Sequence, residues 1–203
     1  MKNNLTALGL TLAMVAVLTG CAAKIKYPSY YTLNVPPAPD PVAQEQVRPS
    51  IAVREFQAPG YLRQGPIVYR SAPEEIGFYE YHRWAADPRV QVTNAVVDHL
   101  MAGGQFAAVS KHDGHSNADY ILSGRLEKLE EVDYDGGVKV EVAISAQITR
   151  LAGGATVWSN TVSETAAVPQ RNVPGVVSQM NKSMDLVLNK LLATIPARMA
   201  NNN

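Results

Sequence analysis

A long alternation of apolar and polar residues constrains the fold of this chain more than any other feature of its sequence. Between Val138 and Thr149, Val, Ile and Ala take every second position, and mostly polar residues take the others. A period of two is typical of a β-strand with one dry face and one wet face. Glycine pairs at 136–137 and 153–154 flank the run and can supply the positive φ of tight hairpin turns. The pattern predicts an antiparallel meander whose outer strands are segments 118–134 and 156–164.

Other short runs of β-branched and aromatic residues, bounded by Pro and Gly, predict further strands. They occupy 30–35, 51–56, 66–70, 76–81 and 106–110. The last of these runs has the apolar character of a buried strand. Within the meander, Glu127, Glu130 and Glu131 are expected on the solvent face of their strand, and a paired-carboxylate acid–base site is the alternative.

Two segments have the apolar spacing of helices. Asp87 followed by Pro88 is typical of an N-cap and a first helical position, and the helical spacing continues to Gly103–Gly104. A second helix is predicted from Pro174, with an apolar stripe that reaches Ile195. The stripe is expected to cover the sheet, and a partner-binding stripe is the alternative. Together these elements predict an α+β fold: a single mixed, antiparallel-rich sheet covered by two main helices.

The start of the chain has the features of a lipoprotein signal peptide. Lys2 precedes the uncharged run Leu5–Leu18, which is well short of the about 20 apolar residues of a membrane-spanning helix. Leu18-Thr19-Gly20-Cys21 then resembles a bacterial lipobox, with cleavage between Gly20 and Cys21 and lipidation of the thiol. Cys21 is the only cysteine, which argues against a disulfide. An ordinary signal peptide with an incidental cysteine is the alternative.

Lipidation at this position would anchor a water-exposed domain to a bilayer, because several acyl chains make a lasting attachment. The proline-rich stretch 36–49 is expected to be a linker or a long loop within that domain. The expected organisation is a signal peptide at 1–20, a lipidated tether at 21–29, one domain at 30–198 and a disordered tail at 199–203.

The composition and the motifs exclude several classes of function. The chain has 18 basic and 18 acidic residues, so it lacks the basic excess that nucleic-acid binding requires. Gly60 and Gly65 have the spacing of a phosphate loop, but Pro66 stands where its lysine would be. The loop 112–115, His-Asp-Gly-His, falls short of the convergent ligands of a zinc site and is expected to be solvated. We therefore predict no enzyme, no catalytic residue, no metal site, no cofactor and no nucleic-acid partner.

Aromatic residues are concentrated in the first half of the chain, where seven of the nine tyrosines precede position 82. Tyrosine and arginine are enriched at protein interfaces because they bury a large area and keep a polar group. Tyr79 and Tyr81 have the same parity on a predicted strand, and Phe78 has the other. Phe78 is therefore expected in the core, and Tyr79, Tyr81 and Arg83 are expected to bind a partner. The alternative is that the tyrosines line the edge of the core.

Five motifs follow one another behind the lipobox. They are Tyr30-Tyr31-Thr32-Leu33, Ile51-Ala52-Val53, Pro59-Gly60-Tyr61-Leu62, Ile67-Val68-Tyr69-Arg70 and Trp84-Ala85-Ala86-Asp87-Pro88. In this order they resemble the ABC-type transport auxiliary lipoprotein family, whose members include the paraquat-inducible lipoprotein C type. The resemblance covers roughly residues 30–195, and it departs from the family at Ala86, where an acidic residue is more usual.

The resemblance implies a non-catalytic accessory lipoprotein of an envelope lipid transport system. It implies partners in a mammalian-cell-entry (MCE) domain protein and an ABC permease–ATPase complex. Ala22 stands in place of the aspartate that resembles an inner-membrane retention signal, so anchoring in the outer membrane, facing the periplasm, is expected rather than the inner membrane. A stand-alone periplasmic lipoprotein that binds a lipid or an envelope polymer is the alternative function, and homo-oligomer formation is left open.

Overall fold

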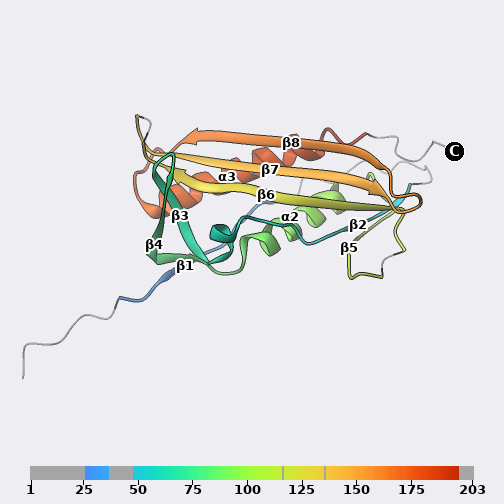
Figure 1. Cartoon of the computed structure of the whole chain (residues 1–203), viewed down its shortest axis with the longest axis horizontal. Coiled ribbons are helices and arrows are strands. Elements are labelled where there is room, and N and C mark those ends of the chain that lie inside the picture. The colour runs from blue at the N-terminus through green and yellow to red at the C-terminus, as the bar shows by residue number, and fades with distance from the viewer. Residues whose placement is uncertain (1–25, 37–47, 116, 135, 197–203) are drawn as a thin grey trace, which may run out of the picture.

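The computed structural model of the chain describes residues 26–36, 48–115, 117–134 and 136–196 (Figure 1). The predicted signal peptide, Cys21 and the tail at 199–203 lie outside the described residues. The elements, in chain order, are β1 (Ser29–Tyr31), β2 (Ser50–Val53), the short 3₁₀ helix η1 (Gly60–Arg63), β3 (Pro66–Ala72), β4 (Glu75–Trp84), α2 (Pro88–Gly103), β5 (Ala108–Lys111), β6 (Tyr120–Val132), β7 (Lys139–Arg150), β8 (Thr156–Ala167) and α3 (Val173–Leu192).

The antiparallel meander predicted from the alternation is confirmed by β6, β7 and β8. β7 pairs along its whole length with β6 on one side and with β8 on the other. Four apolar side chains of β7 are fully buried at alternate positions, whereas Gln147 on the other face is exposed. The four are Val140, Val142, Ile144 and Ile148. The turn glycines have positive φ, with 72° and 142° at 136–137 and 85° and 69° at 153–154.

β6 is the hub of a single eight-stranded sheet. On the side away from β7, β3 pairs parallel with one end of β6 and β2 pairs parallel with the other end. β4 and then β1 extend the sheet beyond β3, and β5 extends it beyond β2. The longest ladders, β6–β7 and β7–β8, are antiparallel. The predicted α+β fold with a mixed, antiparallel-rich sheet is therefore confirmed.

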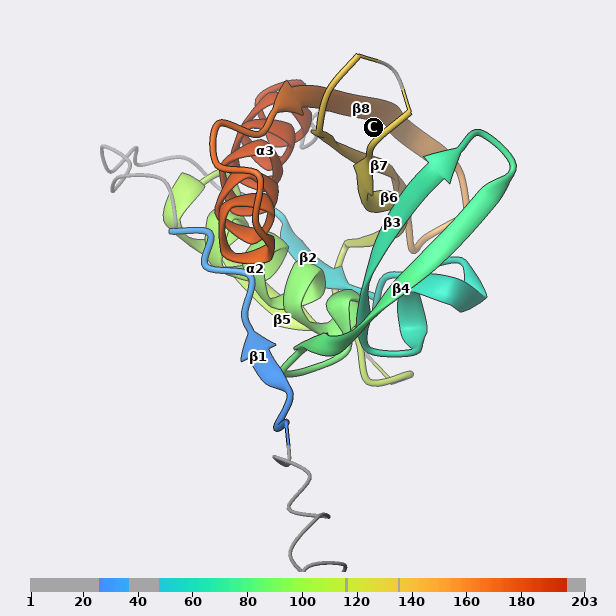
Figure 2. The ribbon, with the colours of Figure 1, turned by 90° about the vertical axis from the view of Figure 1, so that its left-hand side faces the viewer.

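Both helices lie on the same side of the sheet, as Figure 2 shows. α2 starts after its N-cap Asp87 with Pro88 at the first turn, and it ends at Gly104, whose φ is 59°. α3 starts one residue before the predicted Pro174, after the N-cap Asn172. The apolar stripe of α3 is buried against the sheet, which confirms its predicted role as a cover for the core.

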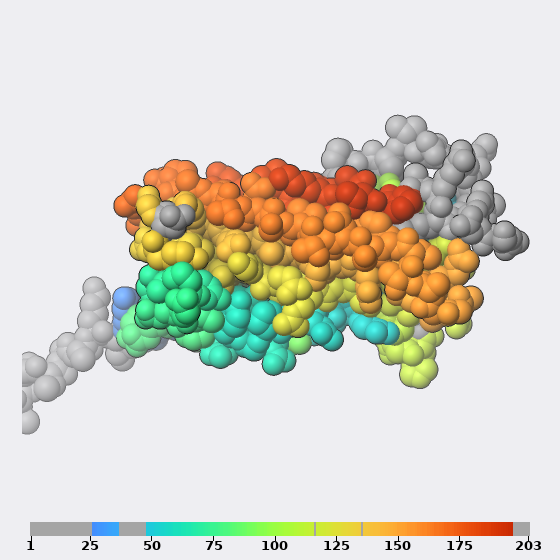
Figure 3. Space-filling view, turned by 45° about the horizontal axis from the view of Figure 1, so that its top comes forward, coloured from blue at the N-terminus to red at the C-terminus, as the bar shows by residue number. Residues whose placement is uncertain are grey.

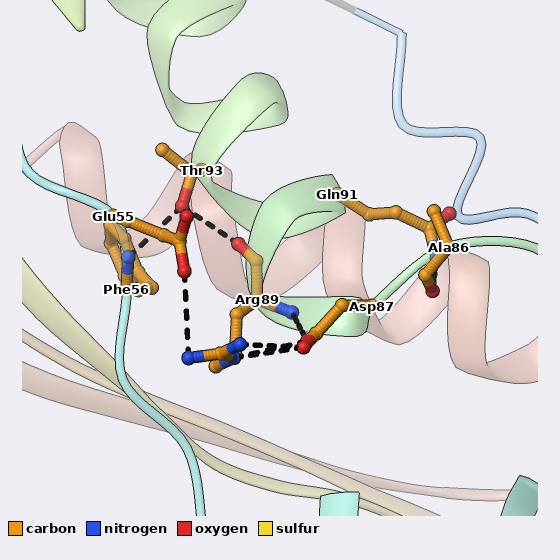
Figure 4. Close-up of polar contacts among 7 residues, drawn as sticks. All are labelled: Glu55, Phe56, Ala86, Asp87, Arg89, Gln91 and Thr93. Atoms are coloured by element: carbon orange, nitrogen blue, oxygen red, sulfur yellow. Dashed lines mark hydrogen bonds and ion pairs between the residues drawn. The ribbon is translucent and has the colours of Figure 1, made fainter. Parts of the chain in front are cut away.

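The N-terminus of α2 is held by polar contacts to a neighbouring segment (Figure 4). The Asp87 carboxylate accepts hydrogen bonds from the Arg89 backbone N–H at 2.9 Å and from the Arg89 guanidinium at 2.7 Å. The same guanidinium lies 3.4 Å from Glu55 in the segment that follows β2. The Thr93 hydroxyl accepts from the Phe56 backbone N–H and donates to the Arg89 carbonyl. These bonds join α2 to the segment that runs beside β6.

β5 differs from its prediction as a buried strand. It pairs only with β2 and is the last strand at that edge of the described sheet. Ala108, Ser110 and Lys111 are exposed, and the apolar run contributes to the core mainly through Phe106, which precedes the strand. An apolar composition could not show that the sheet ends here.

Candidate functional site

The predicted contact residues lie on β4, which forms with β1 a ribbon at the edge of the eight-stranded sheet. The two strands are parallel, and Ser29, Tyr30 and Tyr31 pair with His82, Arg83 and Trp84. One face of the ribbon points inward: Trp84 is buried, and the Tyr31 hydroxyl lies 2.9 Å from Nδ1 of His82. This inward face attaches the first described strand to the core.

The outward face of the ribbon gathers tyrosines and cations. Tyr30 is 63% exposed and lies beside Arg83, whose guanidinium donates to the Gln64 carbonyl at 3.0 Å. The ammonium of Lys26 lies 4.4 Å from the centroid of the Tyr81 ring, which is a cation–π contact. We call Lys26, Tyr30, Tyr81 and Arg83 the tyrosine–cation surface. A surface of this composition can contact both apolar and anionic groups of a partner.

The structure thus brings Tyr81 and Arg83 together and adds two residues that the sequence did not reveal. Lys26 and Tyr30 join the surface only because β1 pairs with β4, and the paired residues Tyr30 and Arg83 are far apart in the sequence. The aromatic character of the segment 27–31 was visible in the sequence, but the strand with which that segment pairs was not.

Tyr79 is placed differently from Tyr81. Its ring lies 5.0 Å from that of Tyr69 and packs against the core, and its hydroxyl donates to Glu131 at 2.8 Å. Phe78 is 38% exposed, so the expectation of Phe78 in the core and Tyr79 outside is wrong. The reason is an irregularity in the β3–β4 ladder between the pairs formed by Phe78 and by Arg83, which breaks the simple alternation.

The glutamates of β6 also differ from their prediction, because Glu130 and Glu131 are buried and only Glu127 keeps substantial contact with solvent. β3 pairs with this end of β6 and covers it. Arg70 of β3 forms an ion pair with Glu130 at 2.7 Å. Burial raises the pKa of Glu131, although the hydrogen bond from Tyr79 acts in the opposite direction. Both carboxylates therefore have structural partners that fix the β3–β4 hairpin on β6.

The other candidate motifs show no converging ligands. Gly60 begins the short helix η1, and Gly65 has a φ of 94° beside the guanidinium of Arg83. The described part of the chain, which includes His112 and His115, contains no group of three or more His, Cys, Asp or Glu side chains placed to hold a metal ion. No helix within the described ranges is long and apolar enough to cross a membrane.

A shallow groove of about 680 Å³ crosses the sheet between the segment after β2 and strand β8. Its walls are mainly hydroxyl, amide and charged side chains, including Gln57, Arg125, Ser145, Gln147 and Thr161. The groove is open and polar. It differs from the closed apolar cavity that binding of a lipid chain requires.

The fold and the candidate site define a class of protein: a two-layer α+β domain with an exposed aromatic and cationic surface beside its first strand. Residues 31–191 match the family model described as the ABC-type transport auxiliary lipoprotein component. The match spans more than half of the chain. The chain therefore belongs to this family, as the ordered motifs predicted.

Solved structures with the same fold support this assignment at the level of architecture. Protein XCC0632 from Xanthomonas campestris has a TM-score of 0.71 at 20% identity, over 81% of this chain and 92% of that chain. A second structure, described as an uncharacterized protein, has a TM-score of 0.63 at 16% identity, over 81% of this chain and 95% of its own. At these identities the similarity concerns the fold alone. No curated protein matches the chain significantly.

Proposed function

We propose that this chain is a non-catalytic accessory lipoprotein that is anchored through an acylated Cys21 and docks onto the transporter it serves. The family assignment supports a lipoprotein that is auxiliary to an ABC-type transport system. In the finer proposal, the partners are an MCE-domain protein and an ABC permease–ATPase complex that move lipid across the envelope. The anchor lies in the outer membrane, and the domain faces the periplasm.

The observation that carries the proposal is the position of the tyrosine–cation surface next to the tether. Lys26, the first described residue, is part of the surface and follows Cys21 closely in the sequence. Five extended residues span at most about 18 Å. An anchor at Cys21 would therefore hold the surface near the bilayer, where membrane-bound transport partners are accessible. Tyr81 and Arg83 are the proposed contact residues, whereas Tyr79 packs against the core.

A second candidate function is favoured by the open groove. Hydroxyl and amide side chains along its walls suit a hydrated envelope polymer better than a lipid chain. In that case the protein would act alone, and the tyrosine–cation surface would not be needed for binding.

Affinity purification of the full chain in mild detergent tests the proposal. Co-elution of an MCE-domain protein is expected from wild type, and it should be reduced about tenfold or more by Tyr81→Ala with Arg83→Ala, because interface aromatics and arginines are frequent hot spots. The control is Tyr134→Ala with Arg171→Ala, which alters one exposed tyrosine and one exposed arginine elsewhere. Equal co-elution by both double variants would place the interface elsewhere.

Membrane fractionation tests the anchor separately. Cys21→Ala should either release the folded domain from the outer-membrane fraction or accumulate as uncleaved precursor. If this variant is processed and stays with the outer membrane as wild type does, the proposed anchor is wrong, whatever the result of the co-elution.

A further inference from the structure

Strand β8 leaves a long edge of the sheet without a partner strand. It has 12 residues and pairs only with β7 among the strands that the structure describes. Figure 3 shows this part of the chain, in orange, crossing the surface beside α3 in red. Edge strands of this length usually carry lysine, proline or strong bulges that prevent pairing with another chain. β8 has no lysine and no proline, and the irregularity in its pairing is confined to its start.

The odd-numbered residues of β8 point their backbone N–H and carbonyl groups to the open edge. The Val168 N–H donates to the Val138 carbonyl, in the same register as the β7–β8 ladder. In an antiparallel pair, every second residue forms these bonds. The backbone N–H and C=O groups of the even-numbered residues of β8 therefore point to β7. The Thr161 N–H accordingly bonds to the Asn160 side chain and not to β7. Ser159, Ser163 and Thr165 likewise direct their backbone N–H and carbonyl groups outward.

The side chains along this edge would accept another strand. On the solvent face, Ser159, Thr161, Ser163 and Thr165 form a row of small hydroxyl residues, which pair favourably across strands. The only charged residue of β8, Glu164, points to the helix side and is neutralised by Lys190 of α3 at 2.7 Å. No charge of β8 therefore repels an approaching strand.

The helix layer supplies a second contact beside the edge. Lys190 reaches Glu164, and Thr194, one turn later, accepts a hydrogen bond from Asn160. This side of α3 therefore lies next to β8. Leu186, one turn before Lys190, is on the same side of the helix and is 44% exposed. An exposed leucine next to an open strand edge indicates that the covering partner occupies both layers.

We propose that β8 is covered by β8 of a second copy of this chain, paired antiparallel about a two-fold axis at Val162, which places Thr161 opposite Ser163. A strand of this length spans about 40 Å, and the sheet and helix layers together are about 20 Å deep, so each copy buries about 800 Å². That area is the size of a standard stable interface. The two helices α3 meet along their Leu186 sides.

A second copy fits this edge because the edge is complementary to itself. Under this symmetry, hydroxyl residues lie opposite hydroxyl residues, and Glu164 lies opposite uncharged residues of the other copy rather than its own equivalent. A two-fold axis centred at Glu164 would bring two carboxylates together and is disfavoured. The inference does not depend on the transport partner or on the anchor.

The test is the mass of the purified full chain in detergent, measured by light scattering over a range of concentrations. Wild type is expected to be a dimer that dissociates on dilution. Ser163→Lys places like charges near the axis, and Ser163→Pro removes an outward N–H without removing a bond to β7. Both should weaken dimer formation by about tenfold or more. Ser110→Lys, on the exposed edge strand β5, is the matched control and should leave the dimer unchanged.

Cross-linking in cells identifies the occupant of the edge. With a short bis-maleimide, Thr161→Cys should give a homodimer that neither wild type nor Ser110→Cys gives. If wild type is still a monomer at about 100 µM, the inference is overturned, because few specific complexes have a dissociation constant above that concentration. A dimer that survives Ser163→Lys, or a Thr161→Cys adduct with another protein, would also overturn it. If Ser163→Pro lowers the melting temperature, the mass of the Ser163→Lys variant decides the test, because this variant retains the backbone of β8.

Discussion

The N-terminus of α2 allows a quantitative test of how the first half of the domain is held together. Asp87→Ala removes the acceptor for the Arg89 N–H, which costs about 1 kcal/mol for a helix N-cap. It also removes an ion pair whose side chains are 25% and 27% exposed, and a charge favoured by the helix dipole, together about 1 kcal/mol. The free energy of unfolding should therefore fall by about 2 kcal/mol. In a domain of this size that lowers the melting temperature by about 4–8 °C.

Two further variants separate the contributions. Asp87→Asn keeps an oxygen acceptor but loses the charge, so it should lose about half as much stability as Asp87→Ala. Asp98→Ala, on the exposed face of the same helix, should change the free energy of unfolding by less than about 0.5 kcal/mol. Thermal and urea unfolding of all variants should be measured on the same preparation.

The pH dependence has a definite sign. Partial burial acts to raise the pKa of Asp87, but the hydrogen bonds and charge of Arg89 outweigh it and hold that pKa below its ordinary value. The stability that the carboxylate supplies is present above the unfolded-state pKa of about 3.9 and is lost as the pH falls through the lower folded-state pKa. Wild type and Asp87→Asn should converge in stability once the pH falls below the lowered folded-state pKa of Asp87. Equal stability at pH 7 would refute the role of the cap and its ion pair.

Three further substitutions, two of them with a control variant, probe the core and a buried glutamate. Ile144→Asp buries an unpaired carboxylate and should lower the free energy of unfolding by several kcal/mol. Glu141→Ala, on the opposite face, loses only a partly exposed ion pair with Lys128. Equal melting temperatures of the two variants would contradict the assignment of the faces of β7. Glu131→Gln should raise the melting temperature at neutral pH, because burial raises the pKa of Glu131 and its charge lowers stability as the pH rises. A gain in melting temperature that is largest in acid would be inconsistent with this cause. Gly124→Ala would overlap the buried ring of Phe56 and should cost about 1–3 kcal/mol by thermal unfolding, while Gly103→Ala meets open space and should be neutral or stabilising.

The parts of the fold that the sequence predicts depend on neighbouring residues. The alternation in β7, the turn glycines beside it and the capped start of α2 each express a local backbone requirement, and each is found where the pattern places it. The incorrect expectations concern residues whose surroundings come from distant segments. Glu130 is buried because Arg70, 60 residues earlier, covers it, and no period in β6 reveals a parallel strand on its other side.

The predictions for the candidate site show the same difference between local and distant residues. The richness of the segment 78–84 in aromatics was visible, and it led to Tyr81 and Arg83. Alternation placed Phe78 and Tyr79 on opposite sides, and the apolar character of Phe78 assigned it to the core. That assignment is wrong, because the β3–β4 ladder is irregular between these residues and Arg83. Lys26 could not be found from the sequence at all, since its contact with Tyr81 depends on β1 lying beside β4.

The motif Trp84-Ala85-Ala86-Asp87-Pro88 has an architectural role that accounts for its place in the family resemblance. Trp84 is buried, Asp87 caps α2, and Pro88 occupies the first turn of that helix. Ala86 takes part through its carbonyl, which accepts a hydrogen bond from Gln91, while its side chain is exposed. An acidic residue at this position is therefore not needed to build the junction, and its replacement by alanine leaves the fold intact. Because the motif specifies the junction and not a contact, we expect the proposed partner contact on the tyrosine–cation surface beside it.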